Sequence, residues 1–180
     1  TTVSYAVEGG NIYFDTSTGT VTGCDPGVTV ANIPKDIEGV PVTAIGDSAF
    51  SYCYYLTSIT IPDGVTTIGN YAFSYCRGLT SVTIGNSVTS IGNFAFQNCS
   101  GLTSIVVEEG NKKYDSRNNC NAIIETATNT LVCGCSTTII PDSVTTIEDE
   151  AFSGCKGLTN IVIPDSITEI GWSAFHGCEN

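Results

Sequence analysis

Basic residues are scarce in this chain: six Lys and Arg face 18 Asp and Glu over 180 residues, which gives a net charge of −12. Proteins bind nucleic acids and anionic membrane surfaces through clustered basic side chains, so this composition argues against both partners. No apolar run is long enough to cross a bilayer, and we expect no membrane insertion of this segment. Methionine is absent and the chain opens at Thr1 without a signal peptide, so we expect a trimmed or mature fragment.

Groups that could carry out catalysis are also scarce. The single histidine, His176, occupies a position that holds Ser or Gln in other copies of an internal repeat, and such variation is typical of a surface position. The densest acidic cluster, Glu148–Glu150, fits no EF-hand loop, so a solvated face is the main interpretation and weak calcium binding the alternative. No glycine pattern forms a phosphate loop. We therefore predict no catalytic residues, no cofactor and no metal site.

What the chain does contain is repetition. One phrase of twelve residues recurs with a step of 23 residues between neighbouring copies, and its copies are Ile45–Leu56, Ile68–Leu79, Ile91–Leu102, Ile147–Leu158 and, in part, the segment from Ile170 onward. A fixed period of this length is the sequence signature of a solenoid, in which each repeat forms one coil and stacks on its neighbours.

Each regular unit divides into three pieces. Leu79–Ile84 has alternating apolar and polar residues and the spacing of a leucine-rich-repeat strand, Val88–Ile91 is a second short extended run, and Ala95–Cys99 predicts a helical or 3₁₀ turn. No single coil can bury these apolar residues alone, so stacked coils must share one core. We expect parallel pairing in a single curved sheet, one strand per coil, for Ser58–Ile61, Ser81–Ile84, Ser104–Val107 and Asn160–Ile163.

Two stretches break the period. Between Cys99 and Cys155 one unit is about ten residues too long, and its extra segment Asn121–Val132 predicts two strands around a Thr-Asn turn. The same phrase occurs at Asn11–Val21, so we expect a second hairpin that covers the N-terminal end of the core. We predict one domain over 1–180: an N-terminal hairpin and degenerate first coil (1–44), regular repeats (45–106), a long atypical repeat with a hairpin (107–140), and regular repeats truncated at the C-terminus (141–180). Because the last repeat is incomplete and lacks a cap, we expect further chain to follow in the natural protein.

The repeat phrase resembles a known family. Its best copy runs from Ile140–Thr145 through Ala151–Phe152 and Cys155 to Leu158–Thr159 and Ile161, and the match extends over about Cys24–Cys178. This is similar to the BspA-type, or Treponema pallidum-type, leucine-rich repeat family. The resemblance implies a right-handed leucine-rich-repeat solenoid with a parallel β-sheet on one face, short 3₁₀ or extended segments on the other, and here two β-hairpin insertions. It also implies a bacterial or protist protein that is secreted or attached to the cell surface, as several members are similar to adhesins that bind host matrix proteins or other bacteria.

The cysteines form a pattern of their own. Five of the nine occupy one repeat position and should form a row that points into the core: Cys53, Cys76, Cys99, Cys155 and Cys178. The favoured interpretation is a small buried hydrophobic residue. Disulfides between neighbouring coils remain an alternative, weakened by the odd total and by parallel side-chain directions. Zinc is disfavoured because a linear row does not converge four ligands on one point.

Positions that vary between repeats hold several aromatic residues. Core positions are already filled, so many of these aromatics should be exposed, where they commonly mark contacts with a partner. The predicted binding residues are Tyr52, Tyr54, Tyr55, Tyr71, Tyr75 and Phe94, and Trp172 replaces a small polar residue at another variable position. Stacking that only shields the coil edges is the alternative.

The function predicted from these patterns is a non-enzymatic module that binds a protein, such as a host matrix or surface protein, in adhesion or recognition. Two alternatives stay open. The small residues at the outward strand positions favour a rigid spacer that carries other domains, and the aromatic rows also fit a carbohydrate-binding accessory module whose partner is a glycan.

Overall fold

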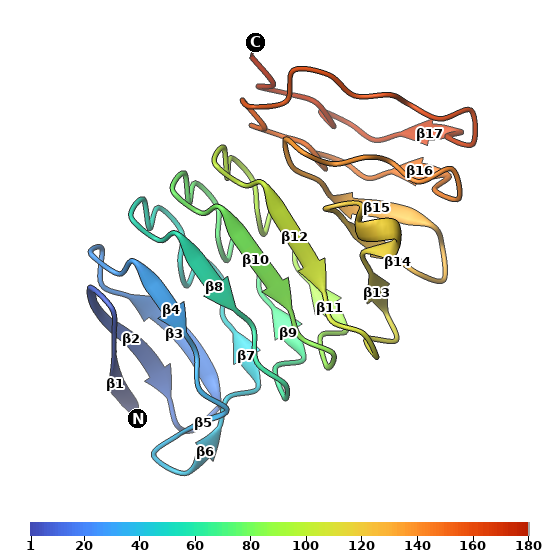
Figure 1. Ribbon diagram of the computed structural model, residues 1–180. Helices are drawn as coiled ribbons and strands as arrows, with labels where there is room; N and C mark the ends of the chain where they lie inside the picture. The colour runs from blue at the N-terminus through green and yellow to red at the C-terminus, as the bar shows by residue number, and fades with distance from the viewer. Residues whose placement is uncertain (180) are drawn as a thin grey trace.

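Short strands and turns recur along the whole chain, and the computed structural model winds them into stacked coils of a β-solenoid (Figure 1). The structure describes residues 1–179; Asn180, the last residue of the predicted final repeat, lies outside the described residues. The predicted 3₁₀ pieces at Ala95–Cys99 and its equivalents are turns, with bonds such as Cys99 N–H to Phe96 O at 3.3 Å. Within residues 1–179, the 3₁₀ helix η1 (Arg117–Asn119) is the one helix.

One sheet has the parallel pairing expected of a leucine-rich repeat. Its strands, in spatial order, are β12 (Ser104–Val107), β10 (Ser81–Ile84), β8 (Ser58–Thr60) and β4 (Val30–Asn32). Val82 lies between Ile59 and Ile105 in register, and these three side chains are buried. Three of the four strand segments predicted from the sequence are thereby confirmed. Side chains alternate between the two faces of a strand, so every second one lies in the core.

A second sheet lies across the core and begins with the predicted N-terminal hairpin. Its order is β1 (Thr2–Val7), β2 (Gly10–Asp15), β3 (Thr20–Cys24), β7 (Ala44–Ile45), β9 (Thr67–Ile68) and β11 (Ser90–Ile91). β1, β2 and β3 pair antiparallel, and the later strands pair in parallel from coil to coil. Val3 and Val7 of β1 pack against the core, so this end is covered as expected. A small hairpin of β5 (Asp36–Ile37) and β6 (Val40–Pro41) projects from the first coil.

The second predicted hairpin starts a separate sheet in the middle of the chain. Its order is β13 (Tyr114–Asp115), β14 (Ile123–Glu125), β15 (Thr130–Cys133), β16 (Thr146–Ile147) and β17 (Glu169–Ile170). The antiparallel strands again come first and the parallel strands follow. The chain therefore begins a coil array twice, each time from a hairpin.

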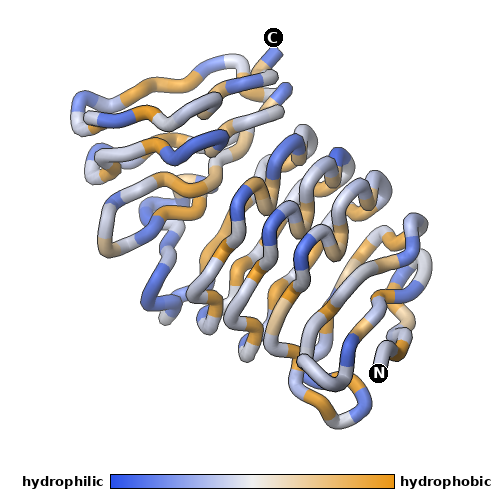
Figure 2. Tube along the Cα trace, turned by 180° about the vertical axis from the view of Figure 1, so that it is seen from behind, coloured by the Kyte–Doolittle hydropathy of each residue, from blue (hydrophilic) through white to orange (hydrophobic). Residues whose placement is uncertain are grey.

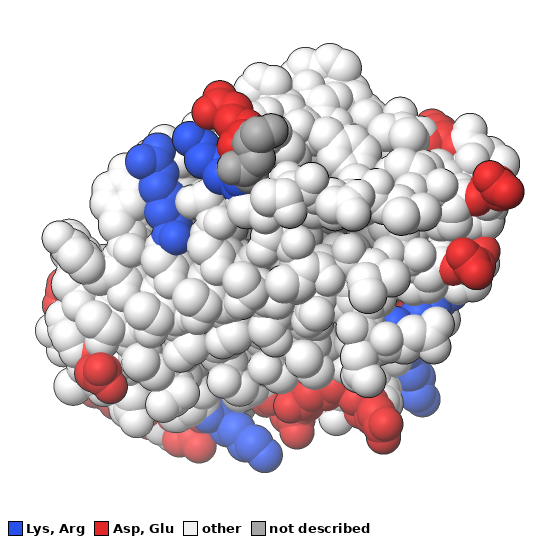
Figure 3. Space-filling view, turned by 45° about the horizontal axis from the view of Figure 1, so that its top comes forward, with Lys and Arg blue, Asp and Glu red and all other residues white. Residues whose placement is uncertain are grey.

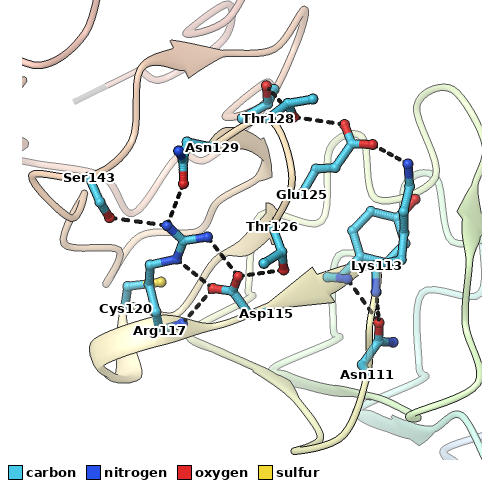
Figure 4. Close-up of polar contacts among 12 residues, drawn as sticks. Asn111, Lys113, Asp115, Arg117, Cys120, Glu125, Thr126, Thr128, Asn129 and Ser143 are labelled. Carbon is cyan, nitrogen blue, oxygen red and sulfur yellow. Dashed lines mark hydrogen bonds and ion pairs between the residues drawn. The ribbon is translucent and has the colours of Figure 1, made fainter.

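A polar network ties the second hairpin to the following coil (Figure 4). The Arg117 guanidinium donates to both carboxylate oxygens of Asp115 at 2.7 Å, and its third nitrogen donates to Asn129 Oδ1 at 2.7 Å and Ser143 Oγ at 3.1 Å. Partial burial alone would raise the pKa of Asp115, but the hydrogen bonds from Arg117 and Thr126 outweigh it and hold the pKa below its usual value. Lys113 pairs with Glu125 in the same hairpin. These charges serve the hairpin's own structure.

The prediction of one continuous sheet with a strand at Asn160–Ile163 is wrong. That segment forms no strand, and the first sheet ends at β12. The reason lies in the long repeat, whose side chains occupy the free edge of β12: Ile105 N–H donates to Asn121 Oδ1 at 3.3 Å, and Val107 N–H donates to Ser116 Oγ at 3.0 Å. With its edge covered, β12 offers no template to the coils that follow.

The hydrophobic core divides at the same place. One cluster of buried residues runs from Ile12 to Val107, in what we call the N-terminal array, and takes in Tyr114, Ile123 and Cys135 of the long repeat. A second cluster runs from Cys120 to Ala174, in what we call the C-terminal array, and Figure 2 shows the C-terminal coils tilted against the rest. Phe73 stacks between Phe50 and Phe96, with centroids 5.2 Å apart on each side, and Phe152 stacks on Phe175 at 5.0 Å. No such stack joins Phe96 to Phe152 among the described residues. Gly134, the residue after β15, lies beside Phe152 instead. Its N–H donates to Ala151 O, and a Cβ on Gly134 would lie 2.1 Å from the Phe152 ring.

Candidate functional site

Two residues in the turn of each regular coil have left-handed backbone conformation. The first position holds Ser48, Tyr71, Phe94, Glu150 and Ser173, with φ between 51° and 57°. The second holds Tyr52, Tyr75, Asn98, Gly154 and Gly177, with φ between 57° and 75°. Bonds between coils fix this backbone, for example Tyr52 N–H to Ser74 O and Tyr75 N–H to Gln97 O, both at 2.8 Å. Four of the six predicted binding residues are thus bulky side chains in a conformation that disfavours them.

Three of the predicted tyrosines meet on the surface. The Tyr52 ring stacks on Tyr75 with centroids 4.9 Å apart, and Tyr54 packs edge-on against Tyr52 at 6.1 Å. The Arg77 guanidinium lies 5.7 Å from the Tyr54 ring and 5.8 Å from the Tyr75 ring. Tyr52 keeps 56% of its surface exposed. We call Tyr52, Tyr54, Tyr75 and Arg77 the tyrosine cluster.

The other predicted residues do not join this cluster by aromatic contact. Tyr71 and Phe94 form a separate stack at 5.2 Å; Tyr71 is exposed and Phe94 half-buried. Tyr55 follows Tyr54 in the chain and is 68% exposed. Arg77 was not among the binding residues predicted from the sequence, although it follows the cysteine of its repeat at the position that holds Tyr54 one coil earlier. That shared position was a signal for contact between the two side chains.

A groove adjoins the tyrosine cluster. It has a volume of about 430 Å³, and its lining includes Tyr75 and Arg77 from the N-terminal array and Trp172 and His176 from the C-terminal array, with Asn98 and Lys156. Trp172 is 71% exposed, and its backbone N–H donates to Asp149 Oδ1 at 2.6 Å. His176 is exposed, as its variable repeat position predicted.

Hydrogen bonds join the two arrays beside this groove. Gln97 Nε2 donates to Glu150 Oε2 at 2.6 Å, and Asn98 N–H donates to Ser153 O at 3.1 Å. A cavity of about 230 Å³ lies next to these contacts, lined by residues that include Phe94, Phe96 and Cys99. Over residues 1–179, no three His, Cys, Asp or Glu side chains are placed to hold a metal ion.

The cysteine row is buried at four positions, and Cys178 is half-buried. All nine cysteines are free thiols. The sequence did not reveal that the thiols are hydrogen-bonded: each of Cys76, Cys99 and Cys178 donates to a phenylalanine carbonyl of the preceding coil, at 3.0, 3.1 and 3.2 Å. Cys155, at the break between the arrays, has Gly134 O as its partner at 3.7 Å. Burial raises the pKa of Cys155 to about 12.

Comparison with known proteins assigns the repeat to a family. A family model described as a BspA type leucine rich repeat region matches six copies over residues 32–131 and 131–180. The chain belongs to this family. The resemblance found in the repeat phrase is confirmed, and with it the leucine-rich-repeat solenoid. Over residues 1–179, no helix of this family member is long and apolar enough to cross a membrane.

Solved structures share the fold. A leucine-rich repeat protein from Bacteroides ovatus ATCC 8483 is 28% identical with a TM-score of 0.54, and the match covers 97% of this chain and 39% of that one. One from Bacteroides capillosus ATCC 29799 is 32% identical with a TM-score of 0.50, over 63% and 88% of the two chains. The pneumococcal vaccine antigen PcpA, 18% identical, has a TM-score of 0.57 over 89% of this chain and 52% of its own, which is likeness of fold alone. The chain thus spans about two fifths of the Bacteroides ovatus protein. A search of curated proteins returned no match.

Proposed function

We propose that this chain is a non-enzymatic protein-binding module of a secreted or cell-surface bacterial protein, with a role in adhesion or partner recognition. One observation carries the proposal: Tyr52, Tyr71, Tyr75 and Phe94 occupy left-handed positions that other coils fill with Ser, Glu, Asn or Gly. A left-handed conformation costs a bulky L-residue roughly 1–2 kcal/mol. Strain of this kind, held by the surrounding structure, is typical of functional sites.

The chemistry of the tyrosine cluster fits protein recognition. Tyrosine and arginine are enriched among the residues that dominate interface energy, because they bury a large flat surface and keep a polar end. Here the Tyr52–Tyr75 stack and the Arg77 guanidinium over Tyr54 and Tyr75 hold the side chains in place before a partner binds. Ordering them in advance lowers the entropic cost of association.

Family membership supports a location at the cell surface or outside the cell, and the net charge is compatible with it. The net charge of −12 keeps the chain away from nucleic acids and anionic membranes, which leaves proteins and glycans as partners. A rigid spacer would need no strained aromatic residues on its surface, so the tyrosine cluster favours a binding role over that alternative.

A second candidate function rests on the groove. Trp172 and Tyr75 line it together with Asn98 and His176, so aromatic faces and hydrogen-bonding side chains meet in one depression. That combination suits the apolar faces and hydroxyl groups of a sugar. A glycan-binding accessory role therefore stands beside protein binding, at an adjoining position.

The test is binding by a Tyr52→Asn/Tyr75→Asn double variant to a panel of matrix proteins, mucins and polysaccharides. Asparagine occupies the same left-handed position at Asn98, so the variant should keep its fold and its melting temperature. Loss of two anchors of about 1–2 kcal/mol each should weaken protein binding by roughly 30- to 700-fold. The control is Tyr5→Thr, an exposed tyrosine of β1 replaced by a residue that suits a strand.

Each outcome separates the candidates. Equal binding by the double variant and the control removes the tyrosine cluster from the proposal. Loss of polysaccharide binding in Trp172→Ala, with protein binding unchanged, supports the glycan candidate. A folded protein that binds nothing on the panel favours the spacer.

A further inference from the structure

Neighbouring coils are joined at their turns by a repeating set of three backbone hydrogen bonds. Three N–H groups of one turn donate to carbonyls of the next coil, and in one regular coil these donors are Tyr71, Phe73 and Tyr75, at 2.8–3.0 Å. The same set recurs in the coil before it and in the C-terminal array. At the break between the arrays only the third bond forms, from Asn98 N–H to Ser153 O. Among residues 1–179, the N–H groups of Phe94 and Phe96 make no hydrogen bond.

Gly134 explains one of the two missing bonds. Its N–H donates to Ala151 O at 2.9 Å, which is the carbonyl that Phe96 N–H would reach if the coils stacked regularly. The carbonyl that matches Phe94 N–H is Asp149 O, and it too accepts no hydrogen bond from the described residues. Polar backbone groups inside a fold are nearly always paired, so unpaired groups on both sides of the break indicate that another molecule fills the gap.

The gap coincides with the cavity of about 230 Å³ at the break. Phe94, Phe96 and Asp149 line this cavity. Ser153 lines it as well, and this residue is 4% exposed with a hydroxyl that has no hydrogen-bond partner in residues 1–179. The apolar part of the lining includes Ile91, Leu102 and Val132. A cavity of about 150 Å³ holds benzene, so this one has room for a phenyl group and several further atoms.

Carboxylates lie at the exposed side of the cavity. The charged residues of its lining are Glu148, Asp149 and Glu150, and neither Lys nor Arg is among them. The last two accept hydrogen bonds from neighbouring coils, whereas the carboxylate of Glu148 has no hydrogen-bond or ion-pair partner among residues 1–179. Basic side chains are few in this chain, and those on the face shown in Figure 3 lie toward its edges. Glu148 is therefore free to pair with a cation from outside.

We propose that this cavity binds a free α-amino acid with an apolar side chain, such as phenylalanine. The carboxylate of the ligand would accept hydrogen bonds from the N–H groups of Phe94 and Phe96. Its ammonium group would donate to Asp149 O and pair with Glu148. Its side chain would lie against the Phe96 ring, which stacks on one other ring where Phe73 stacks on two.

The positions of the unpaired groups identify this ligand class. The equivalents of Phe94 N–H and Asp149 O bond to each other in regular coils, so the ligand groups that satisfy them must be close neighbours, as the two charged groups of an α-amino acid are. Phe94 has a φ of 57°, and left-handed turn residues direct successive N–H groups toward one anion. A simple anion would be repelled by the three carboxylates, and a simple cation would leave both N–H groups unpaired. The site does not depend on the function of the tyrosine cluster.

The test compares phenylalanine with two analogues that each lack one charged group. Phenylpropionate has no ammonium group, and phenylethylamine has no carboxylate. Calorimetric titration should show saturable binding of phenylalanine at one site per chain. Each analogue should bind at least tenfold more weakly, a difference of about 1.4 kcal/mol or more. Hydrogen exchange at the amides of Phe94 and Phe96 should slow in the phenylalanine complex.

A charge variant tests the site in the folded protein. Glu148→Gln keeps the size of an exposed side chain and removes its charge, so it should weaken phenylalanine binding at least tenfold without weakening the binding of phenylpropionate. The matched control is Asp142→Asn, which removes an exposed carboxylate that does not line the cavity and should bind phenylalanine as the wild type does. Both variants should keep the melting temperature of the wild type, because both side chains are on the surface.

Three results would overturn the proposal. Hydrogen exchange at Phe94 and Phe96 that is as slow in the free protein as at Tyr71 and Phe73 would mean that the coils already bond to each other across the break. A lack of saturable binding at millimolar phenylalanine would remove this ligand class. Equal affinity for phenylalanine and either analogue, or equal phenylalanine binding by Glu148→Gln and the control, would show that recognition does not use both charged groups.

Discussion

At the residue scale, one repeat position combines burial with a hydrogen bond. The cysteine thiol is small enough for the tight turn and donates to the carbonyl of the phenylalanine one coil earlier, as Cys76 does to Phe50. Alanine would fill less space and donate nothing, whereas valine would be larger. A buried thiol is also hard to ionise, because removing its proton leaves an unsolvated negative charge. In this row, burial raises the pKa of Cys99, Cys155 and Cys178, so these thiols make the fold sensitive to high pH.

We predict that the free energy of unfolding falls above about pH 9, in part because of Cys155. In the unfolded chain this thiol ionises near its ordinary pKa of 9.0, whereas in the folded chain its pKa is about 12. The stabilisation is complete below pH 9 and is lost as the pH rises toward 12, at about 1.4 kcal/mol per pH unit. Denaturant unfolding of the wild type and Cys155→Ala at pH 8 and pH 10 measures it. The variant should have the shallower pH dependence, and identical slopes would contradict the prediction.

The left-handed turn positions show what the sequence contained at this scale. Gly154, Gly177 and Asn98 share the position of Tyr52 and Tyr75, and glycine and asparagine are the residues that favour positive φ. The backbone conformation could therefore have been predicted by aligning the repeats. The stacking partners also share repeat positions, since Tyr52 and Tyr75 are 23 residues apart and so are Tyr71 and Phe94, and the structure stacks each pair. The edge-on packing of Tyr54 against Tyr52 joins two different repeat positions, so the repeat alone did not predict it.

At the element scale, phenylalanines in the middle of the stack have a ring on both sides, whereas those at its ends have a ring on one side. Phe73 is fully buried between two rings, whereas Phe96 has one ring partner and lines the cavity at the break. The turns that carry these rings are too short to be stable alone, so their order depends on neighbouring coils. A substitution should therefore cost most where coils lie on both sides.

We predict that Phe73→Ala destabilises the protein by about 3–5 kcal/mol, the usual range for a buried phenylalanine. The loss of stability in Phe96→Ala should be smaller than in Phe73→Ala by about 1 kcal/mol or more. Phe96 stacks on one ring in the wild type and not on two, and each such contact contributes about 0.5–1.5 kcal/mol. Urea unfolding of both variants provides the comparison. Equal costs would mean that the cavity beside Phe96 does not weaken its packing.

The strand at Asn160–Ile163 marks the limit of repeat-based prediction for an element. Its apolar pattern matches that of β8 and β10, so the local signal was sound. Strand formation, however, also needs a neighbour, and Asn121 and Ser116 cover the edge of β12 where that neighbour would start. Asn121 and Ser116 belong to the irregular unit. No other copy of that unit shows the register of its residues against β12, so this contact could not be predicted from the repeats.

At the scale of the whole molecule, the period predicted the coils, and the 56 residues between Cys99 and Cys155 predicted the irregular unit. What the spacing did not reveal is that the core divides there. The sequence shows the same hairpin phrase twice. The first hairpin covers the N-terminal end of the first core, and the second hairpin begins the second core. Two arrays with separate clusters of buried residues should not open as one cooperative unit.

We predict that the C-terminal array, which the mid-chain hairpin begins and which runs to residue 179, opens at a lower free energy than the N-terminal array. Native-state hydrogen exchange should show amides around Phe152 exchanging before those of β10 as urea rises. Gln97→Ala removes the side-chain bond to Glu150 and should speed exchange in the C-terminal array by several-fold, since such a bond is worth about 1 kcal/mol. Lys35→Ala, an exposed change in the first coil, should leave both arrays unaffected. A single shared opening free energy would contradict the division.

The hairpin in mid-chain has a consequence for how such a chain can lengthen in evolution. A gene that duplicates whole repeats must preserve the phase of every strand, since an insertion of the wrong length would misalign all later coils. A hairpin that starts a new sheet relaxes this requirement for the strands. β14 and β15 set the register of the strands that follow them, whereas the turns keep the earlier phase, because Asn98 N–H still donates to Ser153 O as Tyr75 N–H does to Gln97 O.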